Sequence, residues 1–154
     1  MEPITLKVKK LREDAVIPSQ AMDGDVGLDL TAVEISYDAY GNLVAHTGIA
    51  IEIPEGYCGV LRARSSIRKK ALVLSNGVGT IENTYRGELL CIFKPVPLFT
   101  QNIDEDKIKD NHTFEVGDRV AQLVITPQIN VITTPVLNLS DTERGDGGFG
   151  STGK

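Results

Sequence analysis

Short apolar runs, each broken by glycine, proline, asparagine or aspartate, dominate this chain, and helical periodicity is nearly absent. The runs include ITLKVKKL, VGLDLTA, HTGIAIEI, YCGVLRA, ELLCIFK, RVAQLVI and INVITTPVL. Runs of this length between turn residues are typical of strands in an all-β sandwich or barrel. SSIRKKALVL is the one weak helix candidate, of one or two turns. We therefore predict an all-β fold with at most one short helix.

The length and charge of the chain limit which classes of protein it can belong to. A chain of 154 residues with 41% hydrophobic and 24% charged residues fits a single domain with a buried core. The net charge of −5 argues against general nucleic-acid binding, which needs a basic surface. We see no signal peptide and no run of membrane-spanning length, so we expect no membrane association. The expected location is the cytoplasm, or the infected-cell cytoplasm if a virus encodes the chain.

Cysteine and histidine usage gives no sign of a zinc site. Cys58 and Cys91 lie in apolar runs without metal-binding spacing, and His46 and His112 are isolated. We interpret both cysteines as small buried hydrophobic residues in a reducing compartment.

Five polar or glycine-rich clusters lie beside the strand-like runs. They are DGDVGLDL (23–30), RARSSIRKK (62–70), NGVGTIENTYRGE (76–88), GDRVAQ (117–122) and the C-terminal RGDGGFGSTGK (144–154). Taken singly, each has an ordinary structural explanation. These explanations are an acidic turn, a solvated basic run, a hairpin, an ion pair between Asp118 and Arg119, and a flexible tail.

Each cluster also carries residue types suited to phosphate chemistry. The basic, hydroxyl-rich second cluster suits a polyphosphate. Asp25 and Asp29 can share a strand face, and carboxylates beside phosphates suit Mg²⁺. Glu82, in a glycine-punctuated hairpin, can act as a general base toward water. The tail fits part of a phosphate-loop pattern, but the chain stops at Lys154, so the tail is either a flexible terminus or a lid over a ligand.

Together and in this order, the clusters resemble the five motifs of the trimeric deoxyuridine triphosphate nucleotidohydrolases (dUTPases). GDVGLDL resembles the family's A-x-A-G-Y-D-L, ARSS resembles P-R-S-G, and GTIENTYRG resembles G-x-I-D-x-x-Y-x-G. GDRVAQ resembles G-D-R-I-A-Q, and the tail resembles R-G-x-G-G-F-G-S-T-G. The resemblance extends from Ile17 to Gly153.

The resemblance implies a β jelly-roll barrel, residues 1–141, and a flexible C-terminal arm, residues 142–154, that closes over the active site. It implies a homotrimer with three active sites shared between subunits. The implied reaction is hydrolysis of dUTP to dUMP and pyrophosphate by Mg²⁺-assisted attack of water on the α-phosphorus. This activity keeps uracil out of DNA and supplies dUMP for dTMP synthesis.

The same resemblance assigns roles to individual residues. Glu82 is expected to orient the attacking water, and Asp29 to hold Mg²⁺ through water. Tyr85 is expected under the deoxyribose, where it leaves no room for a ribose 2′-hydroxyl, and Phe149 is expected to stack on uracil. The complete set of implied substrate-binding residues is Arg64, Ser65, Ser66, Asn76, Gly79, Ile81, Tyr85, Gln122, Arg144, Gly148, Phe149, Gly150, Ser151 and Thr152.

The chain departs from the family pattern at a few positions. Glu82 replaces an aspartate and adds one methylene, Leu28 replaces a tyrosine, and Ser66 replaces a glycine. Either Glu82 still serves as the base, or the enzyme is slow or altered in substrate preference. Residues 95–116 form a longer segment than usual before the fourth motif, either a surface elaboration or a loop that binds a protein partner.

Two other functions compete with this reading. A dCTP deaminase shares some motifs but needs a catalytic glutamate where this chain has Ile92, and an apolar residue cannot shuttle a proton. A nucleotide-binding regulatory protein with impaired catalysis would keep the motifs and bind dUTP without turnover. The intact fifth motif favours the hydrolase over the deaminase.

Overall fold

The computed structural model describes residues 3–97 and 112–148. Within these ranges the regular elements are short strands and a single 3₁₀ turn. The strands are β1 (Lys7–Lys10), β2 (Leu28–Thr31), β3 (Glu34–Tyr37), β4 (Leu43–Glu52), β5 (Tyr57–Ala63), β6 (Leu72–Leu74), β7 (Gly79–Ile81), β8 (Glu88–Pro95) and β9 (Arg119–Pro127), and the 3₁₀ helix η1 spans Ser65–Lys69.

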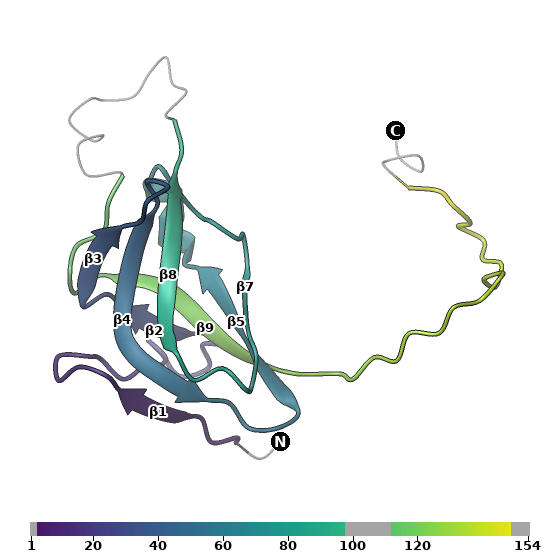
Figure 1. The fold of residues 1–154 in the computed structure, drawn as a ribbon, viewed down its shortest axis with the longest axis horizontal. Coiled ribbons are helices and arrows are strands. Elements are labelled where there is room, and N and C mark those ends of the chain that lie inside the picture. The colour runs from purple at the N-terminus through teal and green to yellow at the C-terminus, as the bar shows by residue number, and fades with distance from the viewer. Residues whose placement is uncertain (1–2, 98–111, 149–154) are drawn as a thin grey trace.

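The strands form two antiparallel sheets that face each other (Figure 1). The five-stranded sheet has the order β1-β4-β8-β6, with β3 paired to the same edge of β4 as β1. The four-stranded sheet has the order β2-β9-β5-β7. Partners distant in sequence, such as β4 with β8 and β2 with β9, make most of these pairings. The predicted all-β, jelly-roll-type fold is confirmed.

The hydrophobic core lies between the sheets and follows from strand alternation. Along β8, Leu89, Cys91 and Phe93 are buried while the residues between them are more exposed, as expected when successive side chains point to opposite faces. Phe93 is fully buried and its ring centroid lies 5.0 Å from that of Phe114. This contact packs the chain that leads into β9 against the inner face of the five-stranded sheet.

The predicted helix is shorter than its sequence pattern allows. Only Ser65–Lys69 coil, as a 3₁₀ turn, and Leu72–Leu74 form β6 instead. Arg64 occupies the N-cap position and its side chain makes no capping bond. The guanidinium group of Arg64 is therefore available for contacts outside the 3₁₀ helix.

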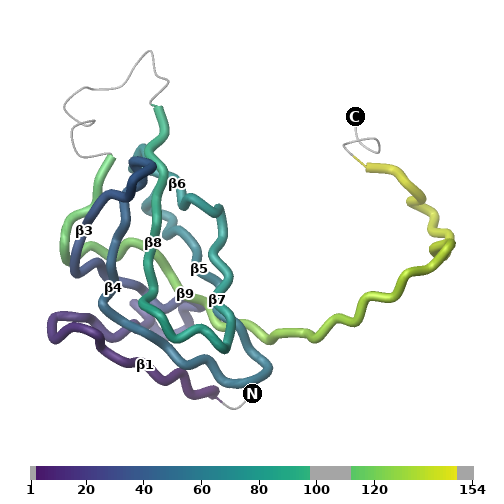
Figure 2. Tube along the Cα trace, in the orientation of Figure 1, coloured from purple at the N-terminus to yellow at the C-terminus, as the bar shows by residue number. Residues whose placement is uncertain are grey.

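Beyond Pro127 the chain leaves the two sheets and runs outward in an extended conformation (Figure 2). Its apolar side chains have little cover, since Ile132 is 92% and Leu137 is 100% exposed. The boundary predicted at residues 141 and 142 remains a prediction. No helix within the described residues is long and apolar enough to cross a membrane.

The burial of Cys91 generates a testable pH dependence. Burial raises the pKa of the Cys91 thiol from 9.0 to about 12. Between these values the unfolded chain releases the proton while the folded chain keeps it, so stability falls as pH rises. We expect a loss of about 1 kcal/mol in the free energy of unfolding between pH 8 and pH 10.

Urea unfolding at both pH values would measure this loss in the wild type and in Cys91→Ala. The other titrating groups are common to both proteins, so the difference between their pH slopes isolates the thiol. Equal slopes would contradict the prediction.

Candidate active site

The buried carboxylate of Asp29 is the centre of a polar cluster that joins three chain segments. Its Oδ1 accepts hydrogen bonds from Arg64 Nε at 2.9 Å and Gln122 Nε2 at 3.2 Å. Its Oδ2 accepts from Arg119 Nη1 at 2.9 Å. Asp29 lies on β2 directly opposite Gln122 on β9, while Arg64 follows β5 and Arg119 begins β9. Sheet register therefore brings the first, second and fourth motifs together.

The hydrogen bonds and opposite charges of the cluster offset the free-energy cost of burying the Asp29 carboxylate. Only 7% of its side chain is exposed, and an isolated carboxylate at such a position would be strongly unfavourable. Two guanidinium partners and an amide supply the opposite charge and the hydrogen bonds that water would otherwise provide. Arg64 also donates to the carbonyl oxygen of Arg119 at 3.3 Å, which fixes the two arginines relative to each other.

A hollow of about 350 Å³ opens beside this cluster and is strongly basic. Four cationic side chains line it against a single carboxylate, that of Asp118. The lining residues are Arg64, Ser66, Lys69, Lys70, Phe114, Gly117, Asp118 and Arg119. A hollow with this charge suits an anion with several negative oxygens, and two arginines can offer paired donors to phosphate.

The third motif forms a different hollow, of about 280 Å³, around the turn between β7 and β8. Glu82 and Tyr85 line it together with Glu88 and apolar residues of β8. The turn closes with a hydrogen bond from Tyr85 N to Glu82 O at 3.0 Å. Glu82 is exposed, so its carboxylate is accessible to a ligand in the hollow.

Asn76 lies in a neighbouring hollow that shares the wall residues Leu90 and Ile92 with the Glu82 hollow. Gly79 and Ile81 lie between them on β7, paired with Leu61 and Gly59 of β5. The predicted third-motif residues are thus grouped, but the basic hollow shares no lining residue with this group. Within one chain, the predicted site is divided into two parts.

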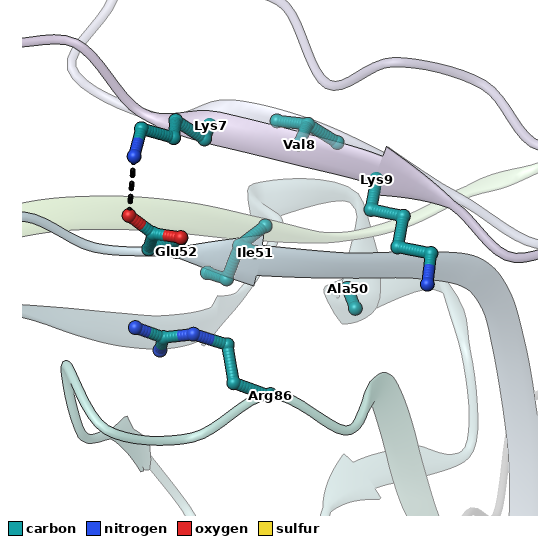
Figure 3. A pocket seen from close by; sticks show the side chains of 7 residues that line it. All are labelled: Lys7, Val8, Lys9, Ala50, Ile51, Glu52 and Arg86. Atoms are coloured by element: carbon teal, nitrogen blue, oxygen red, sulfur yellow. Dashed lines mark hydrogen bonds and ion pairs between the residues drawn. The ribbon is translucent and has the colours of Figure 1, made fainter.

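A further hollow lies between β1, β4 and the third-motif turn (Figure 3). Lys7 Nζ lies 2.5 Å from Glu52 Oε1 across the strands. This bond, the charge of Lys7 and the charge of Arg86 hold the pKa of Glu52 below its usual value. Arg86 itself closes the turn by donating to the carbonyl oxygens of Asn83 at 2.6 Å and Tyr85 at 2.8 Å.

The remaining predicted residues lie outside both parts of the site or outside the described ranges. Ser65 begins η1 and is exposed. Arg144 donates to the carbonyl oxygen of Gly147 at 2.9 Å in the extended C-terminal segment, which also contains Gly148. Phe149, Gly150, Ser151 and Thr152 lie beyond the described residues, as does most of the 95–116 loop.

Sequence reasoning missed the role of Arg119 in this cluster. It paired Arg119 with its neighbour Asp118, but Asp118 Oδ2 instead accepts from Glu115 N at 2.9 Å. Asp118 lies in the turn before β9 and Arg119 is the first residue of the strand, and the turn residues of GDRVAQ are the signal that could have separated the two.

Comparison with known proteins places these motifs in a family. The family model for dUTPase matches residues 13–153. The chain belongs to the dUTPase family. Among curated relatives, the deoxyuridine 5′-triphosphate nucleotidohydrolase of Hydrogenobaculum sp. is 42% identical, covering 96% of this chain and 97% of the relative. The enzyme of the same name from Clostridium tetani is 39% identical over the full length of both chains.

Solved structures of the dUTPase family share the fold. The dUTPase of Staphylococcus bacteriophage 80alpha, solved with dUPNHPP, is 30% identical with a TM-score of 0.77, covering 97% of this chain and 99% of that one. A variant dUTPase from phage phi11 of S. aureus, whose structure describes a structural Mg(II) ion, is 28% identical with a TM-score of 0.71, covering 90% and 100%.

The donor set around Asp29 decides how a magnesium ion fits this dUTPase-family site. The described residues contain no group of three or more histidine, cysteine or acidic side chains able to hold a metal directly. Both Asp29 oxygens are engaged by the arginines and Gln122, yet Oδ2 accepts only one of these bonds. A carboxylate oxygen can accept more than one bond, so Oδ2 can still accept from a water. The cluster fits a metal held through water and not a direct ligand.

Removing the charge of Asp29 should lower the stability of the fold and release the two arginines that line the basic hollow. In Asp29→Asn the two arginines lose their shared carboxylate while remaining partly enclosed. We expect the free energy of unfolding to fall by about 1–3 kcal/mol, toward the low end because the Arg119 side chain is 51% exposed.

Urea denaturation would measure the effect, with Asp23→Asn as a matched control from the same acidic motif. Asp23 is exposed, so its variant should stay within about 0.5 kcal/mol of the wild type. Two variants of equal stability would contradict the central role of Asp29.

Proposed function

We propose that this chain hydrolyses dUTP to dUMP and pyrophosphate, with water attacking the α-phosphorus. The observation that carries the proposal is the Asp29 cluster. It assembles three of the five family motifs beside a basic hollow, in a chain that matches the dUTPase model over residues 13–153. The named activity of the curated relatives supports the same reaction.

The phosphates bind in the basic hollow. Arg64 and Arg119 offer guanidinium N–H groups that Asp29 holds in fixed directions. Ser66 lies beside Arg64, with its hydroxyl 3.5 Å from Arg64 Nη1. Gln122 directs its amide N–H to Asp29, so it supports the phosphates through the cluster. Donors fixed before substrate arrives stabilise phosphate charge without reorganisation during the reaction.

A magnesium ion on the triphosphate, reached by Asp29 through water, would neutralise phosphate charge and favour in-line attack. Glu82 orients the water and accepts its proton. Its extra methylene places the carboxylate farther from the turn than an aspartate would, and its exposure leaves side-chain rotation free to compensate.

Uracil is read by the backbone of β7. This strand is at the edge of the four-stranded sheet, so one row of its N–H and C=O groups lacks a strand partner among the described residues. Such a row around Gly79 and Ile81 can bond the uracil edge and reject the opposite pattern of cytosine. The Tyr85 ring, 42% exposed, is available to lie under the deoxyribose.

The complete site is shared between subunits of a homotrimer. The basic hollow and the Glu82 hollow have no common lining residue within one chain, so a second copy is needed to place a phosphate chain against the base. The extended, apolar segment beyond Pro127 leaves its own chain's sheets and is suited to bind another copy. Arg144, Phe149, Ser151 and Thr152 at its end close over the nucleotide of that neighbour and exclude water.

Substitution of Glu82 separates catalysis from binding. We expect Glu82→Gln to lower kcat for dUTP by at least a hundredfold, because the amide cannot accept the proton of water. The dissociation constant for a non-hydrolysable dUTP analogue should change less than fivefold. Glu82→Asp should retain activity within tenfold of the wild type.

Pyrophosphate release with Mg²⁺ measures these rates, with dCTP, dTTP and UTP beside dUTP. Tight dUTP binding by a wild type that releases no pyrophosphate would contradict hydrolysis and support the regulatory alternative. A deaminase would instead release ammonia from dCTP, which the apolar Ile92 in the wall of the Glu82 hollow argues against.

A further inference from the structure

A diagonal line of polar side chains crosses the outer face of the five-stranded sheet. Ser36 Oγ lies 3.0 Å from His46 Nε2, and His46 Nδ1 lies 3.4 Å from Glu88 Oε2. Because the carboxylate only accepts, Nδ1 donates to Glu88, and Nε2 of the neutral ring accepts from the Ser36 hydroxyl. Each side chain therefore donates a hydrogen bond to the next, from Ser36 on β3 to His46 on β4 and from His46 to Glu88, the first residue of β8.

The second carboxylate oxygen of Glu88 is bound by the backbone of β4. Gly48 N donates to Glu88 Oε1 at 2.8 Å. The pairing of β4 with β8 is interrupted between His46 and Ala50, and Gly48 has a φ of 66°. Such a bulge takes an amide out of the ladder, and here the Glu88 carboxylate satisfies it. Glu88 is thus fixed through both oxygens to one strand.

The Tyr85 ring rests on the residues that Glu88 anchors. Tyr85 Oη donates to the carbonyl oxygen of Glu88 at 3.0 Å. A Cβ at residue 87 would lie 2.3 Å from Tyr85 Oη and 2.6 Å from its Cζ, so only glycine at position 87 permits this approach. Glu82, Tyr85 and Glu88 line the same hollow. The place of the ring in that hollow is set by where Gly87 and Glu88 lie.

We propose that Glu88, held by His46 and the Gly48 amide, is a positioning residue that fixes the Tyr85 ring and so sets discrimination between deoxyribose and ribose nucleotides. The inference rests on the proposed function, in which this ring lies under the sugar. A 2′-hydroxyl is excluded only while the ring stays close to the sugar, and displacements of about 1 Å are large on the scale to which such sites are held. Releasing Glu88 releases the start of β8 and the ring with it.

A pair of substitutions at His46 tests the link. In His46→Asn the amide nitrogen takes the place of Nδ1 and keeps a donor toward Glu88. In His46→Gln the longer side chain places its amide near the former position of Nε2. The hydrogen bond to Ser36 is kept, and the hydrogen bond to Glu88 is lost. We expect the dUTP-to-UTP ratio of kcat/KM to fall at least fivefold in His46→Gln, with a raised KM for dUTP and kcat within twofold. His46→Asn should stay within twofold of the wild type in all three quantities.

Two further variants keep the test decisive if a His46 variant folds poorly. Tyr85→Phe keeps the ring and removes its bond to Glu88, and it should lower the same ratio. Glu34→Gln is the matched control, since Glu34 lies opposite His46 on β3 but its carboxylate accepts a hydrogen bond from Arg12. It should leave the ratio unchanged. Unaltered ratios in both His46→Gln and Tyr85→Phe would overturn the proposal.

Binding separates this inference from the proposed function. Calorimetry with dUMP and UMP measures sugar discrimination without turnover. A wild type that prefers dUMP, loses that preference in His46→Gln and hydrolyses nothing would refute the hydrolase and support the positioning role. A wild type without any preference between dUMP and UMP would overturn the positioning role, whatever its activity.

Discussion

The buried carboxylate of Asp29 is the interaction on which the predicted phosphate site depends. Its partners come from two chain segments other than its own strand β2, since Arg64 follows β5, whereas Arg119 and Gln122 lie on β9. The carboxylate is stable at this depth only because two guanidinium groups reach it, and the guanidinium groups are directed only because it binds them. The same contacts therefore hold β2, β9 and the end of β5 in register and leave positive charge facing the neighbouring hollow.

The positions of the two hollows support the proposal that the active site is shared between subunits. The basic hollow forms between η1 and the segment that leads into β9, whereas Glu82 and Tyr85 lie in the turn that leads from the edge strand β7 into the other sheet. A triphosphate needs its charged and sugar-binding contacts along one continuous path. Separate hollows and an uncovered apolar C-terminal segment are what we expect of a single subunit if the site is shared as proposed.

The fold class and the positions of the motifs could be predicted from the sequence, but the side-chain contacts between the motifs could not. Alternating apolar runs identified the strands because strand alternation is a local property. The pairing of β2 with β9 is set by contacts across the whole chain, so the bonds of Arg64 and Arg119 to Asp29 could not be read from spacing. SSIRKKALVL has the composition of a helix, but Leu72 and Leu74 pair with β8 and bury their side chains, so tertiary contacts override the local preference.

Glu82, at the position where the motif that this chain resembles has aspartate, lies in a turn held by several hydrogen bonds. The turn is closed by the bond from Tyr85 N to Glu82 O, stapled by Arg86 and fixed at its far end by Glu88. A turn fixed so firmly cannot shift its backbone to absorb an added methylene. We therefore expect the adjustment to come from rotation of the exposed Glu82 side chain. The contacts that we propose to position the Tyr85 ring thus also limit how Glu82, the proposed base, can be repositioned.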